Sequence, residues 1–245
     1  MKQEQLRSRV FVIAGLALGI VSLVGTAAAS DQARLGFFGG LNRGNMGGDM
    51  DRFGNELAAE FEEIGGTWAV TKGAKTGPGF GAYYYWPRSP RLGFQFEAHY
   101  ARRGVNFDLE GRIEEFEIVG DLRLKLDYFE LPLLLRIAPL HAGDQRLVFM
   151  AGPVIGFRTA ANLAAEIRAL GQTSSESEDY GGSFKSMILG AVVAVGVTGE
   201  IDRRTSFVLQ ARYHAGLMNA FDDPEFSSRS SDFGIYVGME FALGQ

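Results

Sequence analysis

The chain has 245 residues, with 24 basic and 29 acidic side chains, 33 glycines and no cysteine. The absence of cysteine excludes disulfides and thiolate metal sites, and a net charge of −5 argues against a nucleic-acid binder, whose footprint is basic. A mean hydropathy of zero excludes a protein of several membrane-spanning helices, because each such helix needs about 20 apolar residues.

The start of the chain reads as an export signal. Basic residues precede an uninterrupted apolar run, Val10–Gly25, and Ala27–Ala29 supplies a small-residue cleavage pattern. The alternative is an uncleaved anchor helix, but a run of sixteen residues is short for a bilayer span. We expect cleavage after Ala29, so that residues 1–29 form a signal peptide and residues 30–245 form one exported domain.

The rest of the chain alternates between apolar and polar residues with a period of two. The clearest case is Leu92–Arg102, where Leu, Phe, Phe, Ala and Tyr alternate with Gly, Gln, Glu and His. Such a period puts the apolar residues on one face of a β-strand and the polar residues on the other. The pattern predicts eight strands, over Ala33–Asn42, Gly77–Trp86, Leu92–Arg102, Asp121–Ala138, Arg146–Thr159, Phe184–Gly199, Thr205–Met218 and Asp232–Leu243.

Two of these strands have further features. The phase of the apolar residues changes within the fourth strand, and a bulge near Asp127–Tyr128 would explain the change. The sixth strand contains an apolar run of eleven residues, Met187–Val197, which is too short for a membrane helix and typical of a membrane β-strand.

The connections between the predicted strands alternate in length. Three are short (Pro87–Pro90, His141–Asp144 and Glu200–Arg204) and four are long and polar (Arg43–Thr76, Arg103–Gly120, Ala160–Ser183 and Asn219–Ser231). Outer-membrane barrels have this asymmetry, with short periplasmic turns and longer outer loops. The sequence therefore predicts an all-β fold, an eight-stranded antiparallel up-and-down transmembrane β-barrel with periplasmic termini.

Five segments in chain order resemble one known family. They are Gly39–Asn42 (GGLN), Phe94–Gly104 (FQFEAHYARRG), Tyr128–Arg136 (YFELPLLLR), Ala151–Phe157 (AGPVIGF) and Gln210–Asn219 (QARYHAGLMN). They are similar to the strand motifs of the PorT-like outer-membrane β-barrel domain family. The resemblance implies an outer-membrane location, and most members of that family have no assigned activity.

Polar residues on the predicted inner faces carry both signs of charge. An eight-stranded barrel has an interior just wide enough for side chains to fill, and unpaired buried charge is costly. We therefore expect a salt-bridged lumen rather than an open pore. The residues of this predicted charge network are Glu97, His99, Glu130, Arg136, Arg146, Arg158, Arg212, His214 and Glu240.

Three other functions compete with a closed structural barrel. One is a narrow porin-like channel through the same lumen. A lipid-modifying enzyme is disfavoured, because no Ser or Asp lies at a spacing that indicates a catalytic partner of His99, His141 or His214, the only histidines of the sequence. A periplasmic lipocalin-like carrier is suggested by Gly66–Trp68, but that motif opens the first strand of a lipocalin and here lies within a long connection. We expect no catalytic residue, cofactor or metal.

The long connections are the predicted contact surface. Their acidic clusters lack the spacing of a calcium loop, and within the first of them Asn55–Ile64 has the pattern of a short amphipathic helix capped by Asn55. We expect a structural or surface-interaction role with a possible extracellular partner on these loops. The other expected partners are membrane lipids, lipopolysaccharide and, during biogenesis, the barrel-insertion machinery.

Overall fold

The computed structural model describes residues 32–64, 67–113, 116–142, 144–169, 172–179, 181–222 and 227–243. The predicted signal peptide and its cleavage after Ala29 lie outside these residues. Within the described part no helix is long and apolar enough to cross a membrane.

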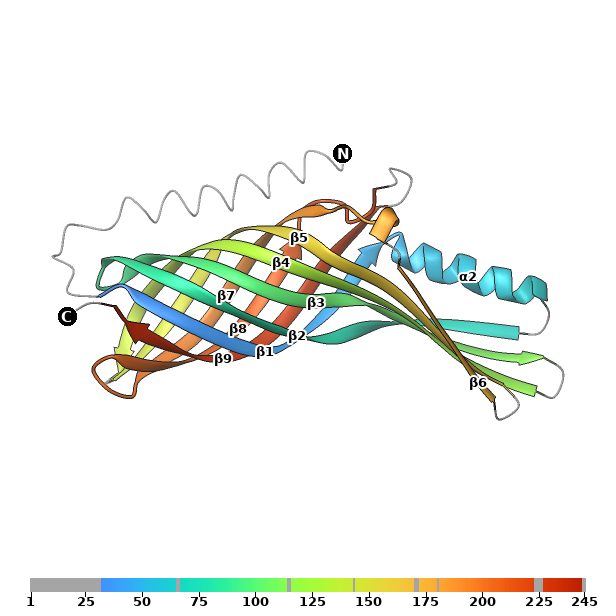
Figure 1. Ribbon diagram of the computed structural model, residues 1–245, viewed down its shortest axis with the longest axis horizontal. Coiled ribbons are helices and arrows are strands. Elements are labelled where there is room, and N and C mark those ends of the chain that lie inside the picture. The colour runs from blue at the N-terminus through green and yellow to red at the C-terminus, as the bar shows by residue number, and fades with distance from the viewer. Residues whose placement is uncertain are drawn as a thin grey trace.

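The described chain is one antiparallel sheet with a single long helix beside it (Figure 1). A short 3-10 helix, η1 (Gly181–Ser183), follows strand β6. The elements are β1 (Arg34–Gly48), α2 (Met50–Ile64), β2 (Thr67–Ser89), β3 (Leu92–Ile113), β4 (Phe116–Ala142), β5 (Gln145–Ala169), β6 (Gln172–Asp179), β7 (Met187–Glu200), β8 (Thr205–Gly216) and β9 (Ser228–Ala242).

Eight strands close into a ring in the order β1-β2-β3-β4-β5-β7-β8-β9. Each pairs antiparallel with its neighbours, and β1 closes the ring on β9 from Arg34 opposite Ala242 to Gly48 opposite Ser228. The predicted eight-stranded antiparallel up-and-down barrel is therefore confirmed. A ninth strand, β6, lies outside the ring and pairs with the far half of β5.

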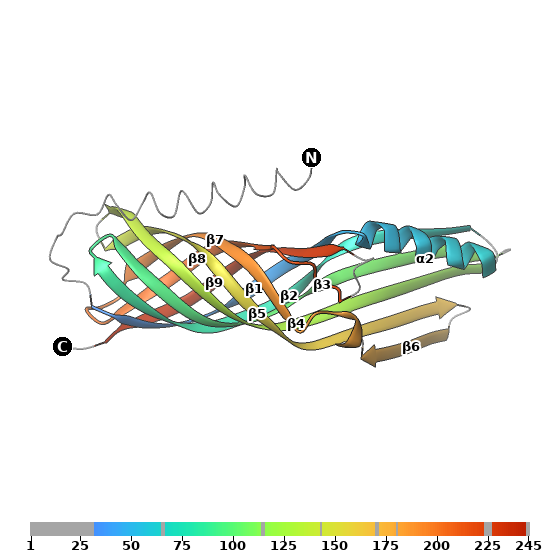
Figure 2. The ribbon, with the colours of Figure 1, turned by 90° about the horizontal axis from the view of Figure 1, so that it is seen from above.

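The two ends of the barrel differ. At one, the turn end, β2, β4 and β7 connect to the next strands by short turns, and β9 ends there close to the start of β1 (Figure 1). At the other, the mouth end, four strands continue past the ring and, with β6, form a sheet that we call the extension (Figure 2). The extension comprises residues 67–74, 105–113, 116–126 and 161–169 together with β6.

The extension corrects the prediction that residues 103–120 and 160–183 are long loops. Val105, Phe107 and Leu109 are buried and alternate with more exposed polar residues, so this segment has the same period of two as the barrel strands. The prediction missed it because the sense of the alternation is reversed. Apolar residues face lipid in a membrane barrel, whereas here they turn inward as in a soluble sheet.

The fourth strand shows where this reversal takes place. Leu126 and Leu134 both point inward, so the side chains of β4 keep one phase throughout. A register shift between β4 and β5 does occur at Asp127–Tyr128, where the sequence predicts a bulge. The register shift at this level falls on β5, where Thr159 is the additional residue. The phase of the apolar residues changes because the interior is polar within the ring and apolar above it.

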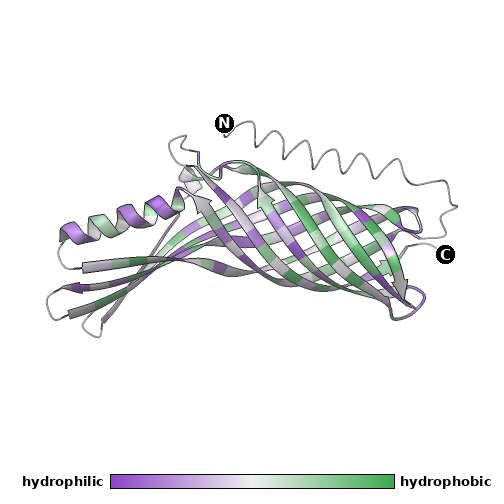
Figure 3. Ribbon diagram, turned by 180° about the vertical axis from the view of Figure 1, so that it is seen from behind, coloured by the Kyte–Doolittle hydropathy of each residue, from purple (hydrophilic) through white to green (hydrophobic). Residues whose placement is uncertain are grey.

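Apolar and polar residues are interspersed along the strands of the ring (Figure 3), and the exposed apolar residues form a band on its outer face. Val237, Leu41 and Ile235 have 63, 62 and 57% of their surface exposed, values that are unusual for side chains of this kind in water. Their neighbours along each strand, such as Tyr236, are buried inside. An apolar exterior and a polar interior are the distribution of a membrane-spanning barrel.

The helix α2 begins at Met50, five residues before the predicted cap Asn55. The chain enters it through Gly48, whose φ of +79° suits glycine, and the amide of Phe53 donates to the Asp49 carbonyl at 2.8 Å. Phe53 packs against Phe107 with 5.6 Å between ring centroids. These contacts hold α2 against the inner face of β2 and β3.

Candidate functional site

The lumen contains four basic and four acidic side chains in three successive groups of ion pairs, which we call together the lumen ladder. They come from five of the eight strands and nearly all lie out of contact with solvent. From the turn end upward they are Arg34, Glu240, Arg136, Glu97, Arg212, Glu130, Arg103 and Asp232. The lumen ladder therefore contains equal numbers of basic and acidic side chains.

The lowest rung is centred on Glu240. Its carboxylate accepts a bond of 2.9 Å from Arg136, one of 2.9 Å from the Tyr83 hydroxyl and one of 3.4 Å from Arg34. The Arg136 guanidinium also lies 4.6 Å from the centre of the Tyr85 ring. Three donors on one carboxylate offset much of the cost of burying it.

The middle rung is the pair Glu97–Arg212. Two parallel bonds of 2.6 and 2.8 Å join the guanidinium to the carboxylate, and the Gln95 amide donates to the same carboxylate at 2.6 Å. The guanidinium lies 4.5 Å from the Phe38 ring centre and 5.4 Å from that of Tyr236. This bidentate geometry with aromatic stacking is the arrangement that favours arginine over lysine.

The upper rung joins Arg103 to two acids. Glu130 accepts bonds of 2.6 and 3.0 Å from its terminal nitrogens, and Asp232 contacts its Nε. His99 lies 3.4 Å from Glu130, and His214 lies 3.6 Å from Asp232 and 3.8 Å from Glu130. Arg103 and the two histidines therefore share the same two carboxylates.

Small residues make room for these large side chains. A Cβ added at Gly36 would lie 2.1 Å from the Tyr83 ring, and one at Gly190 would lie 2.6 Å from Nε2 of His214. The lumen of an eight-stranded barrel is filled by side chains, so a bulky residue on one strand requires a small one opposite.

Seven of the nine residues predicted for the lumen network lie in the ladder or against it. They are Glu97, His99, Glu130, Arg136, Arg212, His214 and Glu240. The structure places the other two elsewhere. Arg146 pairs with Glu200 at 3.1 Å at the turn end, since it lies one residue after the start of β5. Arg158 lies where β5 leaves β7, and it donates to the carbonyls of Gly181, Phe184 and Lys185.

Three members of the ladder, Arg34, Arg103 and Asp232, were not among the predicted site residues. The prediction places Arg103 in an outer connection, although Arg103 continues the inward series that begins at Gln95 and includes Glu97. Asp232 and Arg34 lie at the ends of predicted strands. The alternation of side chains between the two faces of a strand is enough to place both on the polar face. The same signal that found the other residues could therefore have found these three.

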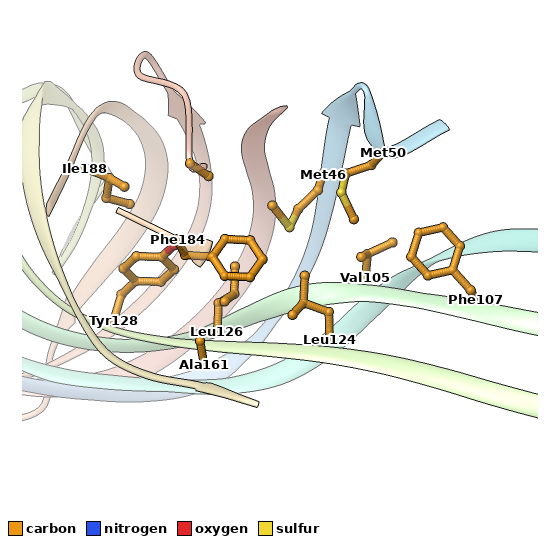
Figure 4. Close-up of a cluster of buried hydrophobic side chains, with 11 residues drawn as sticks. Met46, Met50, Val105, Phe107, Leu124, Leu126, Tyr128, Ala161, Phe184 and Ile188 are labelled. Carbon is orange, nitrogen blue, oxygen red and sulfur yellow. The ribbon is translucent and has the colours of Figure 1, made fainter. Parts of the chain in front are cut away.

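Above the ladder, the mouth of the barrel is filled by apolar side chains, the mouth cluster (Figure 4). Tyr128 joins the two regions, because its ring lies 5.6 Å from the Arg103 guanidinium. The cluster consists of Met46, Met50, Val105, Phe107, Leu124, Leu126, Tyr128, Ala161, Phe184, Ile188 and Ala220. The described interior therefore has charged side chains toward the turn end and apolar side chains at the mouth end.

The described residues contain no group of three His, Asp or Glu side chains able to hold a metal ion. The side chain of His141, the third histidine considered above, is outside the described part.

A family model for the outer membrane protein β-barrel domain matches residues 28–222. A search of curated proteins finds no match to the chain. Similar solved structures include the attachment invasion locus protein Ail of Yersinia pestis, at 14% identity, with 86% of this chain and 99% of that chain covered and a TM-score of 0.38.

Two further structures have comparable scores. Neisserial surface protein A has 11% identity and a TM-score of 0.43, over 86% of this chain and 97% of its own. The outer membrane protein OprG of Pseudomonas aeruginosa has 8% identity and a TM-score of 0.44, over 89% and 98%.

Proposed function

The chain belongs to the family of outer membrane protein β-barrel domains, its place is the bacterial outer membrane, and we propose that it serves there as a closed barrel that presents the extension to binding partners outside the cell. The observation that carries this proposal is the extension itself, a sheet of β-strands that continues past the ring. Its mouth end faces outward, because short turns of such barrels lie in the periplasm.

The free edge of β6 is the proposed binding element. All eight of its residues are exposed, and it is the last strand of the sheet order, paired only with β5. An open edge offers unpaired main-chain donors and acceptors to an added strand. Glu176, Glu178 and Asp179 lie on β6 without any basic residue, so the partner that fits is an extended basic segment.

A peptide-binding experiment tests this role. The full mature protein in nanodiscs is titrated with an extended peptide of alternating lysine and valine. We expect saturable binding that weakens with salt and that is lost in Glu176→Lys/Glu178→Lys. The matched control is Glu62→Lys/Glu63→Lys, which makes the same charge change on exposed positions of α2. Equal binding by both variants, or none by the native protein, would contradict the proposal.

The closed lumen is tested separately. We propose that the ladder and the mouth cluster plug the lumen. We therefore expect no stable conductance steps in planar bilayers, and large steady openings would favour the channel alternative. The balanced charges of the ladder support a plug, since each carboxylate has an arginine within bonding distance.

We also propose the finer assignments that the sequence suggests. These are a PorT-like position within the family, removal of residues 1–29 after Ala29, insertion by the barrel-assembly machinery, contact of the outer band with lipid and lipopolysaccharide, and a role without catalysis. Mass spectrometry of the purified membrane form tests the cleavage site directly, because a mass that includes residues 1–29 would exclude it.

A further inference from the structure

A cleft of about 320 Å³ opens at the mouth end, between α2, the extension and the two loops that follow β6 and β8. Its walls are mainly aromatic and aliphatic, and they include Phe53, Phe107, Leu124, Leu163, Phe184 and Phe221. This volume is within the range of small-molecule sites in proteins, which are concave and mostly apolar. No residue of the lumen ladder lines it.

The cleft has a closed floor. Leu126 and Met46 are fully buried in the mouth cluster beneath it, and Tyr128, a member of the same cluster, contacts the charged Arg103. A molecule that enters from outside therefore stops at this level, and the cleft is a binding site rather than the entrance to a path through the barrel.

The walls are held in place independently of any ligand. On one side the Phe53 ring packs on Phe107. On the other, the Phe184 and Phe221 rings lie 4.6 Å apart, and the amide of Lys185 donates to Ala220 at 2.8 Å. Since both walls are fixed by contacts within the chain, the site is preformed and binding requires little ordering of side chains.

The lining also specifies the chemistry of the occupant. The polar side chains that line the cleft are Ser183 and Asp222, both exposed, and Asp222 disfavours an anion such as a fatty acid carboxylate. Phenylalanine rings and the flexible thioether of Met50 suit an aromatic or compact aliphatic group. A helix or strand of another protein would need an open groove, whereas this cleft has walls of α2 on one side and Phe184 on the other.

We propose that the cleft binds a compact, uncharged apolar molecule, such as an aromatic hydrocarbon or alcohol, from outside the cell. The site goes beyond the proposed role of the β6 edge, because it uses the inner face of the extension rather than its border. The two can be separated by experiment, since the charge reversals on β6 leave every residue that lines the cleft unchanged.

The test uses the full mature protein in nanodiscs, with methionine methyl groups labelled for NMR and naphthalene as the probe. Met50 lines the cleft, so we expect its methyl signal to shift saturably with naphthalene. Leu163→Trp fills the cleft and should weaken the apparent affinity at least tenfold. Ile167→Trp makes a similar change four residues further along β5, outside the cleft lining, and should retain affinity.

Folding of each variant is checked by the difference in gel mobility between heated and unheated samples. A Met50 signal that does not shift, or that shifts linearly without saturation as naphthalene partitions into lipid, would overturn the proposal. So would equal affinity of native protein and Leu163→Trp, or equal loss in both tryptophan variants. A tighter response to decanoate than to naphthalene would refute the argument from Asp222.

Discussion

The buried pair Glu97–Arg212 allows the lumen ladder to be tested by thermodynamics. Each residue is 5% exposed, and two bonds of 2.6 and 2.8 Å join them. Arg212→Met keeps much of the side-chain volume but leaves the Glu97 carboxylate buried, with the Gln95 amide as its remaining donor. Because breaking one side of a buried ion pair costs about 3–5 kcal/mol, we expect the free energy of unfolding to fall by that amount.

The double variant separates pairing from packing. Glu97→Gln combined with Arg212→Met removes both charges, so no uncompensated ion remains in the lumen. Replacing a whole buried pair by neutral groups is often close to neutral for stability. We therefore expect the double variant to recover most of the loss, which would appear as a strong coupling free energy in the mutant cycle.

Urea unfolding in lipid vesicles, followed by tryptophan fluorescence and gel mobility, is measured for the four proteins of the cycle. These are the native protein, Arg212→Met, Glu97→Gln and the double variant. Arg146→Met is the control, because its pair with Glu200 lies at the turn end with both side chains partly exposed, and such pairs contribute about 0–1 kcal/mol. If Arg212→Met costs no more than this control, or if the two single effects simply add, the ladder does not stabilise the barrel in the way argued.

Three further predictions concern other parts of the chain. Gly36→Val should lower the free energy of unfolding by about 1–3 kcal/mol in the same assay, because its Cβ collides with the Tyr83 ring; no loss would mean that the lumen has spare room. Leu131→Arg should cost about 2–4 kcal/mol, since this exposed residue faces the bilayer, and unchanged stability would contradict that orientation. Burial, a hydrogen bond that the protonated Asp108 carboxyl donates to Asp121, and repulsion between the two carboxylates raise the pKa of Asp108. The folded extension therefore keeps this proton to a higher pH than the unfolded chain does, and it loses stability as pH rises through the raised pKa. Asp108→Asn should flatten that pH dependence in denaturant unfolding of the extension followed by its tryptophan fluorescence, and an unchanged pH profile would refute the cause given.

The barrel could be predicted from sequence because its signals are local. The alternation along Asp232–Leu243 reports which side of one strand is apolar, and short turns such as Glu200–Arg204 report where a strand reverses. Both properties depend on neighbours within a few residues. The same parity identified seven of the nine predicted lumen residues without any knowledge of their partners.

The extension escaped prediction for a related reason. The period of two indicates that Val105, Phe107 and Leu109 share one face of the strand. It does not indicate whether that face contacts lipid, water or another element. The expected rule for a membrane strand, with apolar residues outside, ceases to hold where the strands leave the bilayer. The helix α2 then supplies the cover that the inner face needs, and only the folded chain brings it there.

The sequence by itself determined the class of fold, the lipid-facing band and the polar character of the lumen, since these follow from residue type and a period of two. Only the tertiary structure decided which charges pair. Glu97 meets Arg212 across 115 positions of sequence, while Arg158 turns away to backbone carbonyls at the mouth. That choice depends on the stagger of the strands around the closed ring, which sets the height of every inward side chain and is a property of closure rather than of any one strand.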